Sequence, residues 1–328
     1  MEARRRESAM RGRSILVLYL KGVAMGAADA VPGVSGGTVA FIAGIYETLV
    51  DAIRSFDGEA ARLLFRGRWA AFWRHVNGGF LVVLFAGIGT AILLLSRLLL
   101  HLMDHEPEML WSFFFGLILA SVLAVSRKVE RRDLPVLLSG LIGVGIGYGI
   151  TVAVPAATPE TLVFVFLSGA VAICAMILPG ISGSFILVLL SKYRYVFGAI
   201  RDLNLPVILV FGAGCAVGLL SFSHLLHYTL RRHYAPTIAA LTGLMVGSLN
   251  KVWPWKRVVE SFVKPDGEIV PLVERNLSPF SYLEATGRDP RLMSAVLLAA
   301  VGFGLVLWLS RMGEGPAQKF EEGSGQGR

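Results

Sequence analysis

Residues 31–38 read Val-Pro-Gly-Val-Ser-Gly-Gly-Thr, and residues 178–184 read Leu-Pro-Gly-Ile-Ser-Gly-Ser. Each stretch interrupts an apolar segment that would otherwise continue as a helix. Proline removes a backbone hydrogen-bond donor and clashes with the preceding turn, while glycine tolerates positive φ angles. The two stretches therefore predict two broken helices, each with a Pro-Gly-x-Ser-Gly turn at the break.

The sequence around these two breaks is duplicated. Residues 14–53 align with residues 161–200 without gaps, and the shared Pro-Gly-x-Ser-Gly core is too specific to be a chance match between apolar segments. Matching residues in the first copy are Leu20, Gly22, Ala28, Pro32, Gly33, Ser35, Gly36, Tyr46, Ala52 and Ile53, and in the second Leu167, Gly169, Ala175, Pro179, Gly180, Ser182, Gly183, Tyr193, Ala199 and Ile200. Later matches join Gly87, Gly116 and Ser121 to Gly214, Gly243 and Ser248, and Val144, Gly145 and Gly147 to Val301, Gly302 and Gly304. We predict two related halves.

The composition places most of the chain in lipid. Of its 328 residues, 55% are hydrophobic and only 16% are charged, and the mean hydropathy is +0.65. A membrane-spanning helix needs about 20 mostly apolar residues. Apolar stretches of roughly that kind cover residues 14–30, 37–53, 78–103, 108–126, 134–154, 161–178, 184–200, 205–230, 236–253 and 291–310. The predicted fold class is an all-α polytopic membrane protein.

Several other classes of protein and site are excluded by the placement of particular residues. The formal net charge is +8, but Lys and Arg lie mainly at the edges of apolar stretches, where they act as topology signals, so we predict no nucleic-acid partner. Cys174 and Cys215 both lie in apolar stretches and predict neither a disulfide framework nor a metal site. Arg4, Arg5 and Arg6 resemble the start of a secretory signal, but Lys21 interrupts the apolar run, so we expect the first segment to be retained.

These patterns divide the chain into four regions. Residues 1–13 form an N-terminal tail, and residues 14–154 form the first membrane repeat, with an Arg-rich interfacial linker at 54–77. Residues 161–310 form the second repeat, which contains an extramembrane insertion at 254–290. Residues 311–328 form a Gly-rich polar tail that we expect to be disordered.

The number of crossings predicts that the two halves have inverted topology. Each half starts with a broken pair, re-entrant or fully spanning, which adds an even number of crossings, and three further spans follow. The second half therefore enters from the opposite side. The positive-inside rule places both termini, the 54–77 linker and the arginines at 127–132 and 231–232 in the cytoplasm of a multi-pass protein of the cytoplasmic membrane. Lys192, Arg194 and Arg201 fall outside in this scheme and oppose the rule.

The breaks also predict a binding site for an anion. Hydroxyl groups and free N–H groups at a helix start, together with the positive end of the helix dipole, suit phosphate. Matching breaks in two halves of a transporter are typical of its binding site. The predicted phosphate ligands are Ser35, Gly36, Gly37 and Thr38 from the first break and Ser182, Gly183 and Ser184 from the second. The competing interpretation is that both are turns chosen for close packing and helix capping.

Charged residues lie close to both breaks. Lys21, Asp29 and Glu47 stand in apolar sequence, and Arg194 takes the place of Glu47 in the second half. Ionisable groups at membrane depth are costly and therefore candidates for function. Lys21 or Arg194 could neutralise an anionic substrate, and Asp29 and Glu47 could exchange protons or ions during transport. The alternative is that Lys21 reaches the membrane surface and Glu47 caps a hairpin end.

Residues 33–36 also match Gly-x-Ser-Gly, the pattern in which intramembrane serine proteases place their nucleophile. Such an enzyme needs a base, usually His, on another helix. Only His224 and His227 lie inside an apolar stretch, and a symmetric duplicated motif favours a pathway over a single nucleophile. We predict that the protein is not an enzyme and holds no cofactor or metal.

Residues 21–38, which read Lys-Gly-Val-Ala-Met-Gly-Ala-Ala-Asp-Ala-Val-Pro-Gly-Val-Ser-Gly-Gly-Thr, continue to Gly-Ile-Tyr-Glu at 44–47. This stretch closely resembles a family of bacterial and archaeal membrane proteins linked to polyprenyl-phosphate translocation, and residues 178–184 fit the same family. The resemblance covers roughly residues 14–310. It implies a flippase that returns undecaprenyl phosphate to the cytoplasmic leaflet for reuse in cell-envelope synthesis, by alternating access between the halves.

Two other functions are also consistent with the sequence. One is a transporter of a small water-soluble anion, which would have a closed polar cavity without a lateral opening to lipid. The other is an intramembrane serine hydrolase. The partners expected under the first reading are the polyprenyl-phosphate substrate and membrane lipids, and no oligomeric state is predicted.

Overall fold

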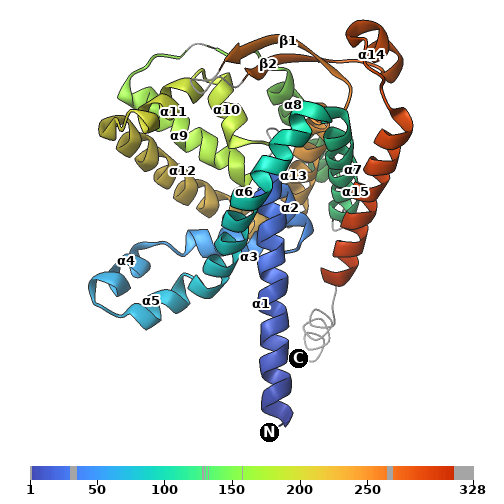
Figure 1. Ribbon diagram of the computed structural model, residues 1–328. Helices are drawn as coiled ribbons and strands as arrows, with labels where there is room; N and C mark the ends of the chain where they lie inside the picture. The colour runs from blue at the N-terminus through green and yellow to red at the C-terminus, as the bar shows by residue number, and fades with distance from the viewer. Residues whose placement is uncertain are drawn as a thin grey trace.

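The computed structural model describes residues 2–313 apart from 30–34, 128, 130, 132, 157 and 264–268. The described residues form 15 helices and one two-stranded sheet (Figure 1). The first half contains α1 (Glu2–Asp29), α2 (Gly36–Ile42), α3 (Tyr46–Arg54), α4 (Gly58–Phe65), α5 (Trp69–His75), α6 (Gly78–His105), α7 (Pro107–Ser126) and α8 (Leu134–Val152). The second contains α9 (Leu162–Ile177), α10 (Gly183–Leu189), α11 (Tyr193–Arg201), α12 (Leu205–Arg232), α13 (Tyr234–Ser248), β1 (Lys256–Val263), β2 (Ile269–Asn276), α14 (Pro279–Thr286) and α15 (Leu292–Gly313).

The β-hairpin corrects the prediction of an all-α protein. β1 and β2 pair antiparallel within the predicted extramembrane insertion at 254–290, and the register shifts around Glu260. Val258 and Val259 in β1 and Val270 and Val273 in β2 are β-branched residues that favour strands. The sequence did not predict these strands, because polar residues lie between the apolar ones and the segment shows no clean alternation of apolar and polar positions.

The helices that follow the breaks are themselves bent. The apolar stretches expected at 37–53 and 184–200 each form two short helices, which meet at 117° for α2 and α3 and at 112° for α10 and α11. Gly44 (φ +69°) and Ser191 (φ +54°) take left-handed backbone conformations at these bends. α2 and α10 have seven residues each. A helix of that length rises about 10 Å, a third of the hydrocarbon core, so neither helix can cross a membrane alone.

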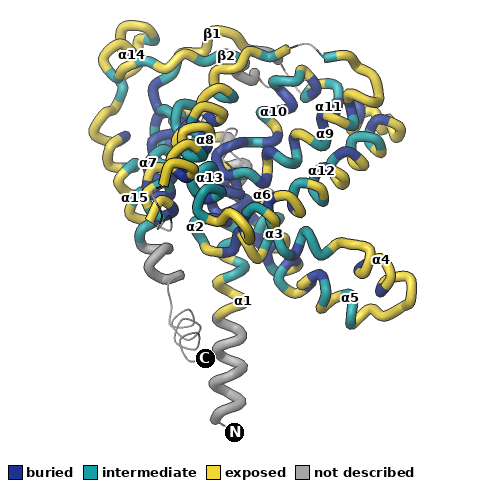
Figure 2. Tube along the Cα trace, turned by 180° about the vertical axis from the view of Figure 1, so that it is seen from behind, coloured by how far each residue is buried: buried dark blue, intermediate teal, exposed yellow. Residues whose placement is uncertain are grey.

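The long helices carry the apolar surface expected in lipid. α7, α8 and α12 are each long and apolar enough to span a membrane, and the described residues give up to six spans if every bent pair counts as one. Many large apolar residues are exposed, and the buried positions gather at the centre of the bundle (Figure 2). Examples of exposed ones are Leu93, Leu94, Val163, Leu209 and Leu297.

Glycines set the closest helix contacts, and these contacts recur in the two halves. Gly22 of α1 packs on the Leu84 carbonyl of α6, and Gly169 of α9 packs in the same way on the Phe211 carbonyl of α12. In return, Gly87 of α6 meets the carbonyl of Tyr19, and Gly214 of α12 meets that of Phe166. Each pair of equivalent contacts follows the alignment of residues 14–53 with 161–200 and of Gly87 with Gly214. The alignment therefore describes equivalent positions in space.

Two further helix pairs join one half to the other. α7 packs on α15, where Gly302 meets the carbonyl of Phe113, and α13 packs on α8, where Gly143 meets the carbonyl of Ala240. Gly302 thus occupies the place of Gly143, whereas the alignment paired it with Gly145. The alignment was wrong by two residues in this helix, because repeated Gly at alternate positions allows several equally good registers.

Replacing Gly143 with Ala should destabilise the protein by about 1–3 kcal/mol, the usual cost of overpacking a tight contact. Its added Cβ would overlap the Ala240 carbonyl oxygen. Gly145→Ala, two residues further along α8, meets no atom within 4 Å and is the matched control. It should leave stability unchanged or raise it slightly, since Ala is the better helix former. Thermal unfolding in detergent measures both, and equal effects would contradict this packing.

The chain places different segments at the two ends of the bundle. α4, α5 and the start of α1 lie at one end, and the hairpin and α14 lie at the other (Figure 1). A cavity of about 530 Å³ is lined by Arg131 and Asp133 before α8 and by Arg232 and His233 before α13. The α7–α8 and α12–α13 connections therefore lie side by side. At the opposite end, Arg291 forms an ion pair with Glu106, just before α7.

Candidate functional site

The start of α2 is closed by groups of its own half. The Pro32–Gly33 turn lies outside the described residues, but both sides of it are described. Ser35 is the N-cap of α2, and its Oγ accepts from Gly37 N at 3.1 Å. Asp29, the last residue of α1, accepts from Gly36 N through Oδ1 at 2.7 Å. A carboxylate therefore occupies the position at a helix start where an external anion would bind.

The two breaks are in direct contact. Ser35 Oγ donates to the carbonyl oxygen of Leu178, the C-cap of α9, at 3.1 Å. Gly180 N donates to Thr38 Oγ1 at 2.9 Å. Gly37 lies so close that an added Cβ would come within 2.6 Å of the Ile177 carbonyl oxygen. Polar groups freed by the second break are thus paired by side chains of the first, which is how irregular backbone is tolerated at membrane depth.

A third helix closes the second break from another side. Gly180 has φ +89°, and an added Cβ there would come within 2.6 Å of Ser248 Oγ on α13. Ser35, Thr38 and Ser248 are each at least 98% buried. The described contacts therefore form a compact polar junction of both halves inside an apolar bundle.

The second break leaves its hydroxyl groups more accessible than the first. Ser182 is the N-cap of α10 but makes no capping bond with its side chain. Its Oγ lies 2.9 Å from Ser184 Oγ, and Ser184 is exposed. Gly183 packs on the carbonyl of Ala172 in α9. Of the seven predicted phosphate ligands, Ser182 and Ser184 are the ones whose hydroxyl groups are open to an incoming group.

The predicted counter-charges lie away from the helix starts. Lys21 Nζ donates to the carbonyl oxygen of Ala43, the C-cap of α2, at 2.6 Å. It therefore stabilises the opposite end of α2 from Ser35. Glu47 and Arg194 lie in the first turns of α3 and α11, and both are exposed. The structure brings Asp29 to the junction and keeps Glu47 and Arg194 beyond the bends.

Sequence reasoning missed two polar features of the site region. His227 on α12 lies 2.5 Å from Asp51 on α3, a pairing hidden by their separation along the chain. The Tyr46 hydroxyl is buried, and within the described residues it has no hydrogen-bond partner. A buried orphan of this kind points to a water or ligand. No group of three metal-ligating side chains is found among the residues that the structure describes.

These features define a class. The chain is a polytopic helical membrane protein in which short, bent helices from two related halves meet at paired breaks. A family model described as undecaprenyl phosphate translocase-like matches residues 25–270, and the chain belongs to this family.

Two curated relatives have names that agree with that assignment. A polyprenyl-phosphate transporter of Vibrio cholerae serotype O1 is 48% identical over 91% of this chain and 97% of its own length. A polyprenyl-phosphate transporter of Staphylococcus aureus is 31% identical over 72% of this chain and 85% of its own length. No solved structure gives a significant match.

Proposed function

We propose that the protein moves undecaprenyl phosphate across the cytoplasmic membrane, so that the carrier lipid can be reused in cell-envelope synthesis. The observation that carries the proposal is the direct contact of the two breaks, where Ser35 and Thr38 bind the backbone at Leu178 and Gly180. The names of the family and of both relatives support the substrate. The polar junction receives the phosphate, and the lipid chain stays in the bilayer.

The phosphate site consists of Ser35, Gly36, Gly37 and Thr38 and of Ser182, Gly183 and Ser184. Asp29 already holds the N–H group of Gly36, so an entering phosphate must replace that carboxylate. Asp29 then acts as an internal competitor, which binds the helix start when the site is empty and expels the phosphate when it returns. In the proposed cycle, Asp29 or Glu47 exchanges protons or ions. Lys21 or Arg194 balances the charge of the phosphate.

The transport cycle is alternating access between inverted halves. In the described state the Ser35–Leu178 and Thr38–Gly180 contacts hold the halves together. The phosphate can pass only when these contacts open, first toward one side and then toward the other. Two helix pairs join the halves, α7 with α15 and α8 with α13. In the proposed cycle the two halves rock against each other at these equivalent surfaces.

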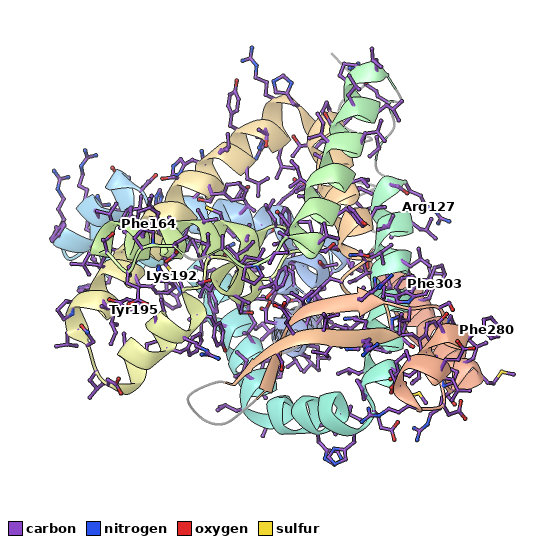
Figure 3. The ribbon with its side chains drawn as sticks, turned by 90° about the horizontal axis from the view of Figure 1, so that it is seen from above. Arg127, Phe164, Lys192, Tyr195, Phe280 and Phe303 are labelled. Atoms are coloured by element: carbon purple, nitrogen blue, oxygen red, sulfur yellow. The ribbon has the colours of Figure 1, made fainter. Side chains whose placement is uncertain are left out.

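We propose that both termini lie in the cytoplasm. The Arg-rich α4–α5 segment lies at the same end as the start of α1, and the hairpin lies at the other end (Figure 1). Lys192, which opposed the positive-inside rule, is 1% exposed and donates to the Thr158 carbonyl oxygen at 2.7 Å, beside Tyr195 (Figure 3). A lysine buried in protein is a weak topology signal.

Labelling of Glu47→Cys and Arg194→Cys from the same side of the membrane would contradict inverted halves.

Reconstitution tests the function. Vesicles that contain undecaprenyl phosphate in both leaflets are treated from outside with an impermeant phosphatase. Without protein, hydrolysis should stop at about half of the lipid, and with the protein it should proceed to completion. A plateau at half in the presence of folded protein contradicts the proposal. Uptake of inorganic phosphate in its place would favour the small-anion transporter. An active-site serine hydrolase is disfavoured, since the relatives are named transporters.

A further inference from the structure

Three charged side chains are buried together where the hairpin meets the bundle. Lys251 follows α13, Lys256 begins β1 and Glu274 lies in β2. Glu274 Oε2 lies 2.7 Å from Lys251 Nζ and 3.5 Å from Lys256 Nζ. The side chains of Lys251, Lys256 and Glu274 are only 15%, 5% and 13% exposed, respectively. We call these three residues the hairpin cluster.

Hairpin register and aromatic rings hold the hairpin cluster in place. Lys256 pairs with Asn276 and Val258 with Glu274, so Lys256 and Glu274 lie diagonally on one face of the hairpin. Lys256 Nζ lies 3.8 Å from the centre of the Trp111 ring on α7, and Lys251 Nζ lies 4.5 Å from that of Phe185 on α10. Cation–π contacts of this length partly replace the water lost on burial.

The hairpin cluster carries an excess of positive charge. Two ammonium groups share one carboxylate oxygen. Burial lowers the pKa of Lys256 to about 8, although Glu274 opposes the change. Burial would raise the pKa of Glu274, but Lys256 and Lys251 hold it below its ordinary value. With both lysines protonated and Glu274 ionised, the three groups sum to one net positive charge, which is costly to bury without a further anion.

The hairpin cluster also lies beside the more accessible of the two breaks. Phe185, which Lys251 contacts, directly follows Ser184, and Ser182 and Ser184 carry the hydroxyl groups that remain open. Seen from the hairpin end, the two strands lie across the end of the bundle (Figure 3). Lys251 therefore lies next to the start of α10, and Lys256 is joined to it through Glu274.

We propose that Lys251 and Lys256 form a docking site for a phosphomonoester at the hairpin end of α10, where the phosphate replaces Glu274 before it enters the junction of the breaks. The inference rests on the proposed function, since it names the groups that first receive the same substrate. A phosphate dianion matches two ammonium groups better than one carboxylate does. Binding of the phosphate would release the Glu274 carboxylate from Lys251. Lys251 also contacts Phe185 of α10.

A purely structural role predicts a different response to mutation. If Glu274 only fastens the hairpin, Glu274→Gln lowers stability and leaves lipid binding unchanged. If Glu274 competes with the phosphate, Glu274→Gln tightens binding even though it removes an ion pair. The sign of the change in affinity therefore separates the two roles, and a loss of hairpin stability alone cannot imitate it.

The test measures binding of undecaprenyl phosphate to the full-length protein in phosphatidylcholine nanodiscs, with undecaprenol as the lipid that lacks the phosphate. Lys251→Gln should raise the Kd at least about tenfold, as expected for loss of a charged hydrogen bond. Glu274→Gln should lower the Kd severalfold. Arg257→Gln removes the same charge from an exposed site of the hairpin and should leave the Kd unchanged.

Several results would overturn the docking site. These are an unchanged Kd in Lys251→Gln, a raised or unchanged Kd in Glu274→Gln, or equal binding of undecaprenol. Inorganic phosphate is titrated in parallel, and saturable binding of it that depends on Lys251, without binding of the lipid, would assign the site to a free anion. Failure of the proposed function is distinguishable, because wild-type protein would then not translocate the lipid in the phosphatase assay.

Discussion

Replacing Ser35 and Ser182 together with Ala should slow translocation of undecaprenyl phosphate at least about tenfold. Ser35 links the two halves through the Leu178 carbonyl and caps α2 through Gly37 N. Its loss leaves buried backbone groups unpaired, each at a cost of about 1–3 kcal/mol. Ser182 offers the accessible hydroxyl of the second break. The phosphatase assay in vesicles gives the rate, and thermal unfolding gives the accompanying loss of stability.

The matched control is Ser121→Ala with Ser223→Ala. Both residues are buried, and each hydroxyl donates only within its own helix, to Leu117 and Leu220 among the described contacts. This variant removes the same number of hydroxyl groups, neither of which makes a described hydrogen bond to a break, and should translocate at nearly the wild-type rate. Equal rates in the two double variants would remove Ser35 and Ser182 from the phosphate site.

Asp29→Asn should separate binding from turnover. The amide oxygen can still accept from Gly36 N, so the start of α2 stays capped, but the negative charge that competes with phosphate is gone. We expect the Kd for undecaprenyl phosphate to fall about tenfold, the scale of one charge-assisted hydrogen bond. Turnover should fall by at least a similar factor, because no carboxylate returns to expel the phosphate.

The control for Asp29 is another carboxylate at a helix start. Asp133 accepts from Val136 N at 3.3 Å and caps α8 outside the junction. Asp133→Asn removes an equal charge and should change neither binding nor turnover. If Asp29→Asn binds and transports like the wild type, the carboxylate does not compete with the substrate and the displacement step is wrong.

The helices and the second break were predictable because their signals are local. Pro179 and Gly180 stop α9, and Ser182 starts α10, through backbone constraints that depend on the residue type alone. The bend at Ser191 has no such signal, since a serine rarely adopts positive φ without tertiary contacts. The hairpin was missed because polar residues interrupt the alternation of its strands, and because its contacts with Trp111 of α7 and with Lys251 join residues that are far apart in the sequence or carry no strand signal.

The candidate site was only partly predictable. The alignment of the halves placed both breaks in equivalent positions, but nothing in the sequence shows that Thr38 accepts from Gly180 or that Asp29 reaches Gly36. Lys21 shows the opposite case. It lies near the first break along the chain and was therefore a candidate for binding the phosphate, but its side chain reaches the far end of α2. Long-range geometry decides which nearby charges share a site.

Alkylation of a cysteine introduced at Ser184 measures whether the phosphate of undecaprenyl phosphate reaches the paired breaks. In protein with Cys174→Ala and Cys215→Ala, Ser184→Cys is alkylated in the presence of undecaprenyl phosphate or of undecaprenol. Ser191→Cys, exposed beyond the other end of α10, is the control. Undecaprenyl phosphate should slow alkylation at position 184 severalfold, with no effect at 191 and none from undecaprenol. Alkylation at 184 that is unchanged by saturating undecaprenyl phosphate would show that the phosphate does not bind at the paired breaks.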